Sequence, residues 1–93
     1  MNIEDVFSSK LRMKILKILM QVGELNVSQI ARRLGVNYKT TIEHLRVLEE
    51  EGVVKHKIFG RIHMYRLDRA SPKTVAIQNL IQVWENQDRI SDD

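Results

Sequence analysis

Apolar residues recur at helical intervals near the start of the chain, within residues 8–24. One side of this pattern carries Leu11, Ile15, Ile18, Leu19 and Val22, and the other carries Lys10, Lys14, Lys17 and Gln21. This spacing predicts an amphipathic helix. Ser8 or Ser9 can cap its start, and Gly23 stands where the helix should end.

Two further helical patterns follow, with only Val36 and Asn37 between them. Residues 25–35 have Ser28 as the expected cap, an apolar stripe of Ile30, Ala31 and Leu34, and Gly35 at the end. Residues 38–52 have Asn37 as the cap, an inward stripe of Thr41, Leu45 and Leu48, and Gly52 at the end. Two helices joined by a tight, glycine-containing turn are typical of a helix-turn-helix unit.

From residue 53 onward the pattern changes to a period of two. Residues 53–59 and 61–67 predict a β-hairpin with its tip at residues 59–61. A two-residue turn at Phe59-Gly60 would pair Val54 with Tyr65, whereas a three-residue loop would pair Val54 with Met64. We favour the first register, because it turns Val54 and Tyr65 inward together.

A last helical pattern begins at Ser71 and Pro72, a capping residue followed by proline at the first helical position. Its apolar stripe would either pack back on its own domain or pair with a second chain, and a bare stripe would promote aggregation. We favour pairing with a second chain. The predicted dimer interface joins this stripe to the amino-terminal apolar residues: Ile3, Val6, Phe7, Ile77, Leu80, Ile81 and Trp84.

The length of the chain indicates a single domain, and the distribution of charge indicates what that domain binds. The chain has 93 residues, 43% of them hydrophobic and 5% aromatic, which allows one domain with a small aliphatic core. Residues 10–73 contain 14 Lys or Arg and 6 Asp or Glu, whereas both ends of the chain are net acidic. A basic module that contains a helix-turn-helix unit is typical of proteins that bind the phosphate backbone of DNA.

Several classes of function are excluded by missing residues. Cysteine is absent, so disulfides, thiolate metal sites and cysteine nucleophiles cannot form. No serine is paired with a plausible base and no glycine-rich phosphate loop occurs, so we expect neither enzymatic activity nor a cofactor. The sequence shows no signal peptide and no membrane span, and a cytoplasmic location without a membrane partner is expected.

Residues 9–69 resemble the winged-helix domain of ArsR-type transcriptional regulators and of related archaeal and bacterial regulators. The resemblance is carried by LRMKILKIL in the first helix, VSQIARRLGVNYKTTIEHLRVLEEEGVV through the helix-turn-helix, and GRIHMYRLD in the returning strand. It implies that the helix entering the major groove of DNA carries Tyr38, Lys39, Thr40, Thr41, His44 and Arg46. Ile42 departs from the family pattern, which is polar there; it either contacts thymine methyl groups or turns inward, and we favour the inward orientation.

The candidate DNA-binding residues fall into two groups. Within helix 38–51 we expect Lys39, Thr40 and His44 to contact base edges and Arg46 to contact a phosphate. Phosphate contacts from outside this helix are expected at the start of the preceding helix and in the wing, residues 53–67: Ser28, Gln29, Lys55, Lys57 and Arg61. Such contacts fix the position of the protein without reading the sequence.

The resemblance to ArsR-type regulators does not imply metal sensing for this chain. In the favoured register His56 and His63 are cross-strand neighbours, but two ligands do not complete a zinc site. Metal-sensing members use cysteine near the reading helix or histidine and carboxylates on the last helix. Here there is no cysteine, and no histidine follows His63. We therefore expect no metal.

The predicted fold class is α+β, mainly helical with a small β-hairpin: a winged helix-turn-helix. Residues 1–70 form the DNA-binding domain, and residues 71–93 add a dimerisation helix and an acidic tail to the same domain. We expect a homodimeric regulator that reads specific sequences of duplex DNA in major grooves about 34 Å apart. Repression by blocking the polymerase is the simplest outcome, although an activator would look the same. The alternatives are an architectural DNA-coating protein and a module whose basic face binds an acidic protein.

Overall fold

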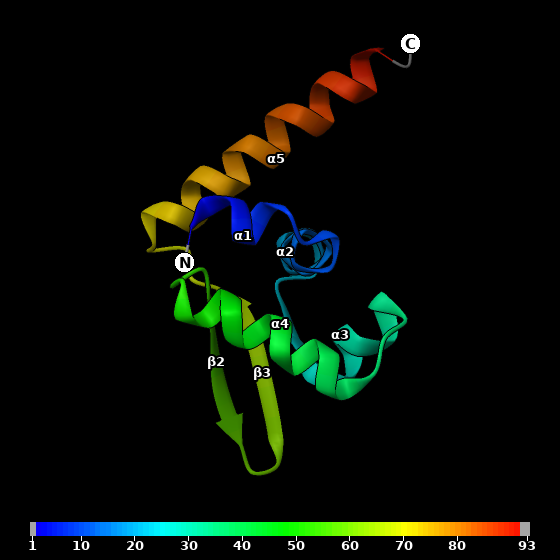
Figure 1. Ribbon diagram of the computed structural model, residues 1–93, viewed down its shortest axis with the longest axis vertical. Coiled ribbons are helices and arrows are strands. Elements are labelled where there is room, and N and C mark those ends of the chain that lie inside the picture. Colours follow the sequence, from blue (N-terminus) through cyan, green and yellow to red (C-terminus); the bar gives the residue numbers. More distant parts are fainter. Residues whose placement is uncertain (1, 92–93) are drawn as a thin grey trace.

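The computed structural model describes residues 2–91 and has the predicted fold class, mainly helical with a small antiparallel sheet. The helices are α1 (Ile3–Phe7), α2 (Lys10–Val22), α3 (Val27–Leu34), α4 (Tyr38–Glu50) and α5 (Pro72–Ser91). The strands are β1 (Glu24–Asn26), β2 (Val54–Phe59) and β3 (Ile62–Leu67). Figure 1 shows α5 extending from one end of the molecule and the β2–β3 hairpin projecting from the other.

The helix starts are set by side chains that accept backbone hydrogen bonds. Ser9 caps α2 and Asn37 caps α4, as predicted; the Asn37 side chain accepts from the Thr40 amide at 2.7 Å. The prediction that Ser28 caps α3 is wrong. Asn26 is the cap, because its side chain and that of Gln29 each accept from the other residue's backbone amide, at 2.8 and 2.9 Å. This reciprocal pair satisfies two amides and starts α3 at Val27.

The sheet has the strand order β1-β3-β2, and all neighbours are antiparallel. Strand β1 was not predicted; its three residues are too few to show an alternating pattern. It pairs Leu25 with Tyr65, and both side chains are buried. Because β1 ends opposite Met64, it pairs with β3 near the base of the hairpin and leaves Ile62 and His63, at the outer end of β3, without a second neighbouring strand.

Both predicted hairpin registers are wrong. The turn lies at Gly60-Arg61, so Phe59 pairs with Ile62 and Val54 pairs with Leu67. Gly60 has a φ of +61°, and no non-glycine residue in the described chain has a positive φ. A two-residue turn with a left-handed glycine first is a favoured hairpin connection, and it spares Phe59 a strained backbone.

The core lies between the sheet and helices α2, α3 and α4. The predicted α4 stripe of Thr41, Leu45 and Leu48 is fully buried in it. Ile42 is half-buried and packs against the same cluster, so the inward orientation is confirmed. The apolar side of α4 therefore fixes which of its residues face solvent.

Helix α5 is attached to the body of the molecule near its first turns. The Thr74 hydroxyl donates to the Val53 carbonyl at 3.1 Å, and Ile81 is buried. Farther along, Lys17 of α2 and Glu85 form an ion pair of 2.9 Å. Most other α5 side chains are exposed. None of the helices within residues 2–91 combines the length and the hydropathy that a bilayer crossing requires.

Candidate nucleic-acid interface

The starts of α3 and α4 and the tip of the wing meet around one shallow groove of about 90 Å³. It is lined by Asn26, Val27, Ser28, Tyr38, Arg61, Ile62 and His63. We call it the α3/α4/wing groove. It brings together three predicted DNA-binding residues, Ser28, Tyr38 and Arg61, from three separate parts of the chain. Sequence reasoning did not identify the other lining residues.

Tyr38, the first residue of α4, lines this groove, and Lys39 and Thr40 follow it in the first turn. Tyr38 and Lys39 are exposed and Thr40 is half-buried. The free backbone amides at a helix start, together with the helix dipole, favour an anion here. On α3, Ser28 is exposed. The side-chain oxygen of Gln29 accepts a hydrogen bond from the Asn26 backbone amide, so the side-chain NH2 group of Gln29 is the part that can donate to a phosphate.

The structure corrects the assignment of Thr41. Its side chain is fully buried, and its hydroxyl donates to the Asn37 carbonyl at 2.9 Å. The position belongs to the core-facing stripe of α4, so a DNA contact through this side chain would require α4 to leave the core. Thr41 is therefore removed from the candidate interface.

His44 is bonded within the protein. Its Nδ1 accepts from Arg12 of α2 at 3.1 Å, and the same guanidinium donates to the Asp5 carbonyl of α1. Burial of the ring lowers the pKa of His44, the Arg12 charge lowers it further, and Glu43 opposes these effects. Of the two ring nitrogens, only Nε2 remains for a contact with nucleic acid.

The lowered pKa of His44 predicts a loss of stability in mild acid. The ordinary pKa of histidine is 6.5, and above this pH the His44 ring is neutral in the folded and in the unfolded protein. Below pH 6.5 the ring takes up a proton in the unfolded chain, whereas the folded protein disfavours its protonation. The free energy of unfolding should therefore fall as the pH falls below 6.5 and level off below the folded pKa. Urea titrations from pH 7.5 to 4.5 measure this, with His44→Gln as the reference. Equal pH slopes for the two proteins would refute the assignment.

The basic side chains of the wing are spread from the tip of the hairpin to its base. Arg61 is at the tip and Lys57 is exposed on β2. Lys55 lies near the base, within 3.7 Å of the Asp68 carboxylate, and faces a separate hollow with Arg66 and Arg69. The structure does not bring Lys55 to the α3/α4/wing groove. Arg46 is exposed on α4.

The wing histidines contact each other and also α4. His56 pairs directly with Tyr65 across the strands, and its ring stacks on Tyr65 and on His63 with centroid distances of 4.8 and 5.6 Å. Its Nδ1 lies 2.5 Å from the Glu49 carboxylate, which joins α4 to β2. Direct pairing of His56 with His63 was therefore a wrong expectation. Among residues 2–91, no three His, Cys, Asp or Glu side chains gather in a way that could hold a metal ion.

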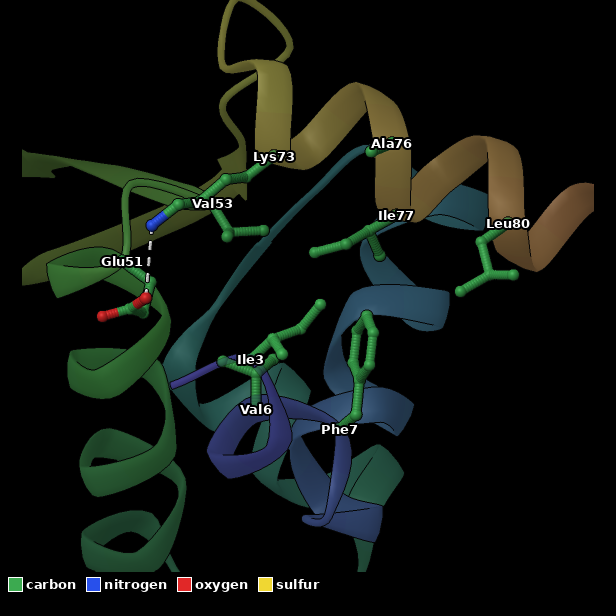
Figure 2. A pocket seen from close by; sticks show the side chains of 9 residues that line it. All are labelled: Ile3, Val6, Phe7, Glu51, Val53, Lys73, Ala76, Ile77 and Leu80. Atoms are coloured by element: carbon green, nitrogen blue, oxygen red, sulfur yellow. Dashed lines mark hydrogen bonds and ion pairs between the residues drawn. The ribbon is translucent and has the colours of Figure 1, made fainter. Parts of the chain in front are cut away.

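Five of the seven predicted dimer residues, all except Ile81 and Trp84, line a second groove of about 340 Å³ between α1 and α5 (Figure 2). We call it the α1/α5 groove. It is lined by Ile3, Val6, Phe7, Glu51, Val53, Lys73, Ala76, Ile77 and Leu80, and the Lys73 ammonium lies 3.3 Å from Glu51 at its edge. Val6 and Ile81 are buried within their own chain, although Val6 also lines this groove, so these two side chains add little accessible surface to the predicted interface.

The remaining members of the predicted dimer interface are accessible. Ile3, Phe7, Leu80 and Trp84 are exposed, with Trp84 at 67%, and Ile77 is half-buried. Val83, at 53%, adds an apolar side chain that the sequence did not single out. An exposed apolar surface of this kind marks an interaction site.

The sequence of this chain is similar to those of known regulatory proteins. Residues 9–56 match the family model of bacterial regulatory proteins of the arsR family. The chain is 32% identical over 78 residues to the HTH-type transcriptional regulator B-115 of Sulfolobus spindle-shape virus 1, covering 84% of this chain and 67% of that protein. It is 34% identical over 71 residues to a cadmium resistance transcriptional regulatory protein, CadC homolog, of Staphylococcus aureus, covering 73% and 59%.

A solved structure shares both the fold and part of the sequence. The homodimeric winged helix-turn-helix DNA-binding domain of a possible ArsR-family regulator from Mycobacterium bovis superposes with a TM-score of 0.73 at 29% identity. The match covers 89% of this chain and 74% of that one.

Proposed function

We propose that this chain, which belongs to the arsR family of bacterial regulatory proteins, is a sequence-specific repressor that reads the major groove with α4. The family assignment confirms the resemblance predicted from the sequence. It makes the chain a DNA-binding transcription regulator of a family that is not enzymatic. The observation that carries the proposal is the meeting of the α3 start, the α4 start and the wing tip around one groove.

The exposed chemistry of these three elements supports a division of roles. Lys39 can donate to the guanine O6 and N7 atoms, and the hydroxyls of Tyr38 and Thr40 can bond base edges or phosphate. Ser28, Lys57 and Arg61 would contact phosphates on either side of α4, and Arg46 would contact a phosphate from the middle of α4. Neutralising several phosphates makes the affinity depend strongly on salt.

We propose that the active species is a homodimer joined through α5 and α1. The support is the exposed apolar surface of Ile3, Phe7 and Leu80 at the α1/α5 groove, together with the exposed Trp84 farther along α5. The Mycobacterium bovis domain of the same fold is homodimeric. A two-fold axis through this surface would set two α4 helices on half-sites about 34 Å apart, one turn of the duplex.

Repression follows from where such a dimer would lie. A protein seated on two successive major grooves, with a wing beside each, covers the duplex against a polymerase that must occupy the same face. Residues 2–91 form one winged helix-turn-helix with α5, and occlusion of the polymerase requires only these elements. Occlusion is therefore the mechanism that needs the fewest additional parts.

Selection from random duplex DNA at physiological salt tests sequence-specific binding. We expect enrichment of a pseudo-palindromic site that binds at least about 1,000-fold more tightly than random duplex. Placed over a promoter, this site should lower transcription in a purified system when the protein is added. Random duplex bound as tightly as the selected site would indicate an architectural protein, and absence of duplex binding would indicate a protein-interaction module.

Two substitutions separate base reading from backbone contact. Lys39→Ala should cost about 1–3 kcal/mol on the selected site and relax the preference at one base pair in each half-site. Arg61→Ala should weaken all duplexes alike and reduce the salt slope by about one. Lys14→Ala, which removes an exposed lysine of α2, is the control of equal charge. If Lys39→Ala and Arg61→Ala change affinity and preference in the same way, the division of roles is wrong.

A further inference from the structure

The wing tip exposes three large apolar side chains. Ile58, Phe59 and Ile62 are exposed by 59%, 58% and 50%. Phe59 and Ile62 are cross-strand partners that flank the Gly60-Arg61 turn, so they lie side by side on one face of the hairpin. Ile58 points to the opposite face, where its partner is His63. Strand β1 does not extend along this part of the hairpin, because it ends opposite Met64.

Charge around the tip favours a polyanion as its partner. Residues 54–67 include Lys55, Lys57, Arg61 and Arg66 and no aspartate or glutamate. Ile62 also lines the α3/α4/wing groove together with Ser28 and Tyr38. A duplex that occupies this groove would therefore lie against the apolar tip as well as against the cations.

The apolar residues have a defined use at a DNA surface. Phe, Leu, Ile, Met and Pro side chains that enter the minor groove can wedge between base pairs, partly unstack them and bend the duplex. The cost of unstacking is lowest at pyrimidine–purine steps such as TA and CA, so a wedge selects sequence without hydrogen bonds to bases. A hairpin that ends in a two-residue turn is narrow, and its tip side chains are the first to reach the floor of a groove.

We propose that Phe59 and Ile62 form an apolar wedge that enters the minor groove beside the α4 site and opens a flexible base step there. This proposal rests on the proposed function, because it requires α4 to lie in the adjacent major groove. The wedge adds a second sequence preference at the edge of each half-site, at positions that no polar side chain reads. Arg61, between the two apolar residues, neutralises phosphates along the edges of the minor groove that the wedge opens.

The experiment uses the full chain and two versions of the selected duplex, with either a TA or a GC step where the wing would lie. In the TA duplex, the adenine of the step is replaced by 2-aminopurine, whose fluorescence rises when the base unstacks. We expect fluorescence to rise on binding of the wild-type protein. We also expect the TA duplex to bind about tenfold more tightly than the GC duplex.

Three variants identify the wedge residues. In Phe59→Ser and Ile62→Ser the fluorescence rise and the TA preference should be lost, while the preference for bases under α4 is kept. Ile58→Ser removes an equally exposed side chain from the opposite face and should behave as the wild type. Unchanged thermal midpoints should show that all three variants fold, since each replaced side chain is exposed.

Other results would overturn the wedge, and they separate it from the proposed function. Tight binding of the selected site by the wild type without a fluorescence rise refutes the wedge and leaves the function intact. Failure to bind any duplex refutes both. If Phe59→Ser leaves DNA binding unchanged but alters the oligomeric state in sedimentation experiments, the tip contacts protein rather than DNA, and the wedge is again refuted.

Discussion

Replacing Leu80 and Trp84 together by aspartate should convert the protein to a monomer and lower its affinity for the selected duplex by at least about 100-fold. Both side chains are exposed on α5, Trp84 by 67%, and both belong to the predicted dimer interface. Burying two carboxylates against a copy of the same surface costs far more than the interface can return. A monomer carries one reading helix, so it loses the gain in affinity that comes from linking two binding events.

Sedimentation equilibrium gives the oligomeric state, and fluorescence anisotropy with the labelled duplex gives the affinity. The matched control is Gln82→Asp with Asn86→Asp, which adds the same charge to exposed positions of α5. At 3.6 residues per turn, these positions lie about halfway around the helix from Leu80 and Trp84. The dimer interface is misplaced if the Leu80/Trp84 variant remains a dimer, or if both double variants become monomers.

Leu45→Ala should lower the free energy of unfolding by about 2–5 kcal/mol. Leu45 has no exposed surface and packs at the centre of the core beneath α4, so its truncation leaves a cavity. Domains of this size have about 5–15 kcal/mol of stability in total, and the loss is therefore a large fraction of it. Urea denaturation followed by circular dichroism measures the change.

Arg46→Ala is the neighbouring control, because Arg46 is exposed and its truncation should change stability by less than about 0.5 kcal/mol. The two variants should behave in opposite ways toward DNA. At a temperature where Leu45→Ala is folded, it should keep its affinity for the selected site, whereas Arg46→Ala should bind less tightly. A small stability loss for Leu45→Ala would mean that α4 is not held by its inner stripe.

Local chemistry accounts for the parts of the fold that the sequence predicted correctly. Helix α4 is identified by a capping asparagine, Asn37, and by an apolar stripe that recurs at helical intervals, and both signals lie within the helix itself. Strand β1 and helix α1 have three and five residues, too few to display a period. The hairpin register depended on which residue adopts a positive φ, and a turn at Gly60-Arg61 avoids placing Phe59 there.

Side-chain accessibility at the interface was harder to predict, because it depends on contacts between distant residues. Thr41 is polar but lies on the inner stripe, so core packing decides its orientation. His44 is bonded to Arg12, 32 residues away, and Lys55 is paired with Asp68 beyond the end of β3. Phe59 is exposed because it lies beside the turn of a hairpin that projects from the body of the molecule (Figure 1), and the alternating pattern of the wing does not reveal this projection.

The most direct test of the proposed interface is a titration of the isotope-labelled protein with the selected duplex, followed by the NMR signals of its backbone amides. We expect the largest shifts at the start of α3, the start of α4 and the wing tip, with Ser28, Lys39 and Arg61 among them. Amides of α5 near Trp84 should move little. Shifts centred on the hollow around Lys55 and Arg69, or on α5, with the α4 start unchanged, would contradict the proposal that α4 reads the DNA.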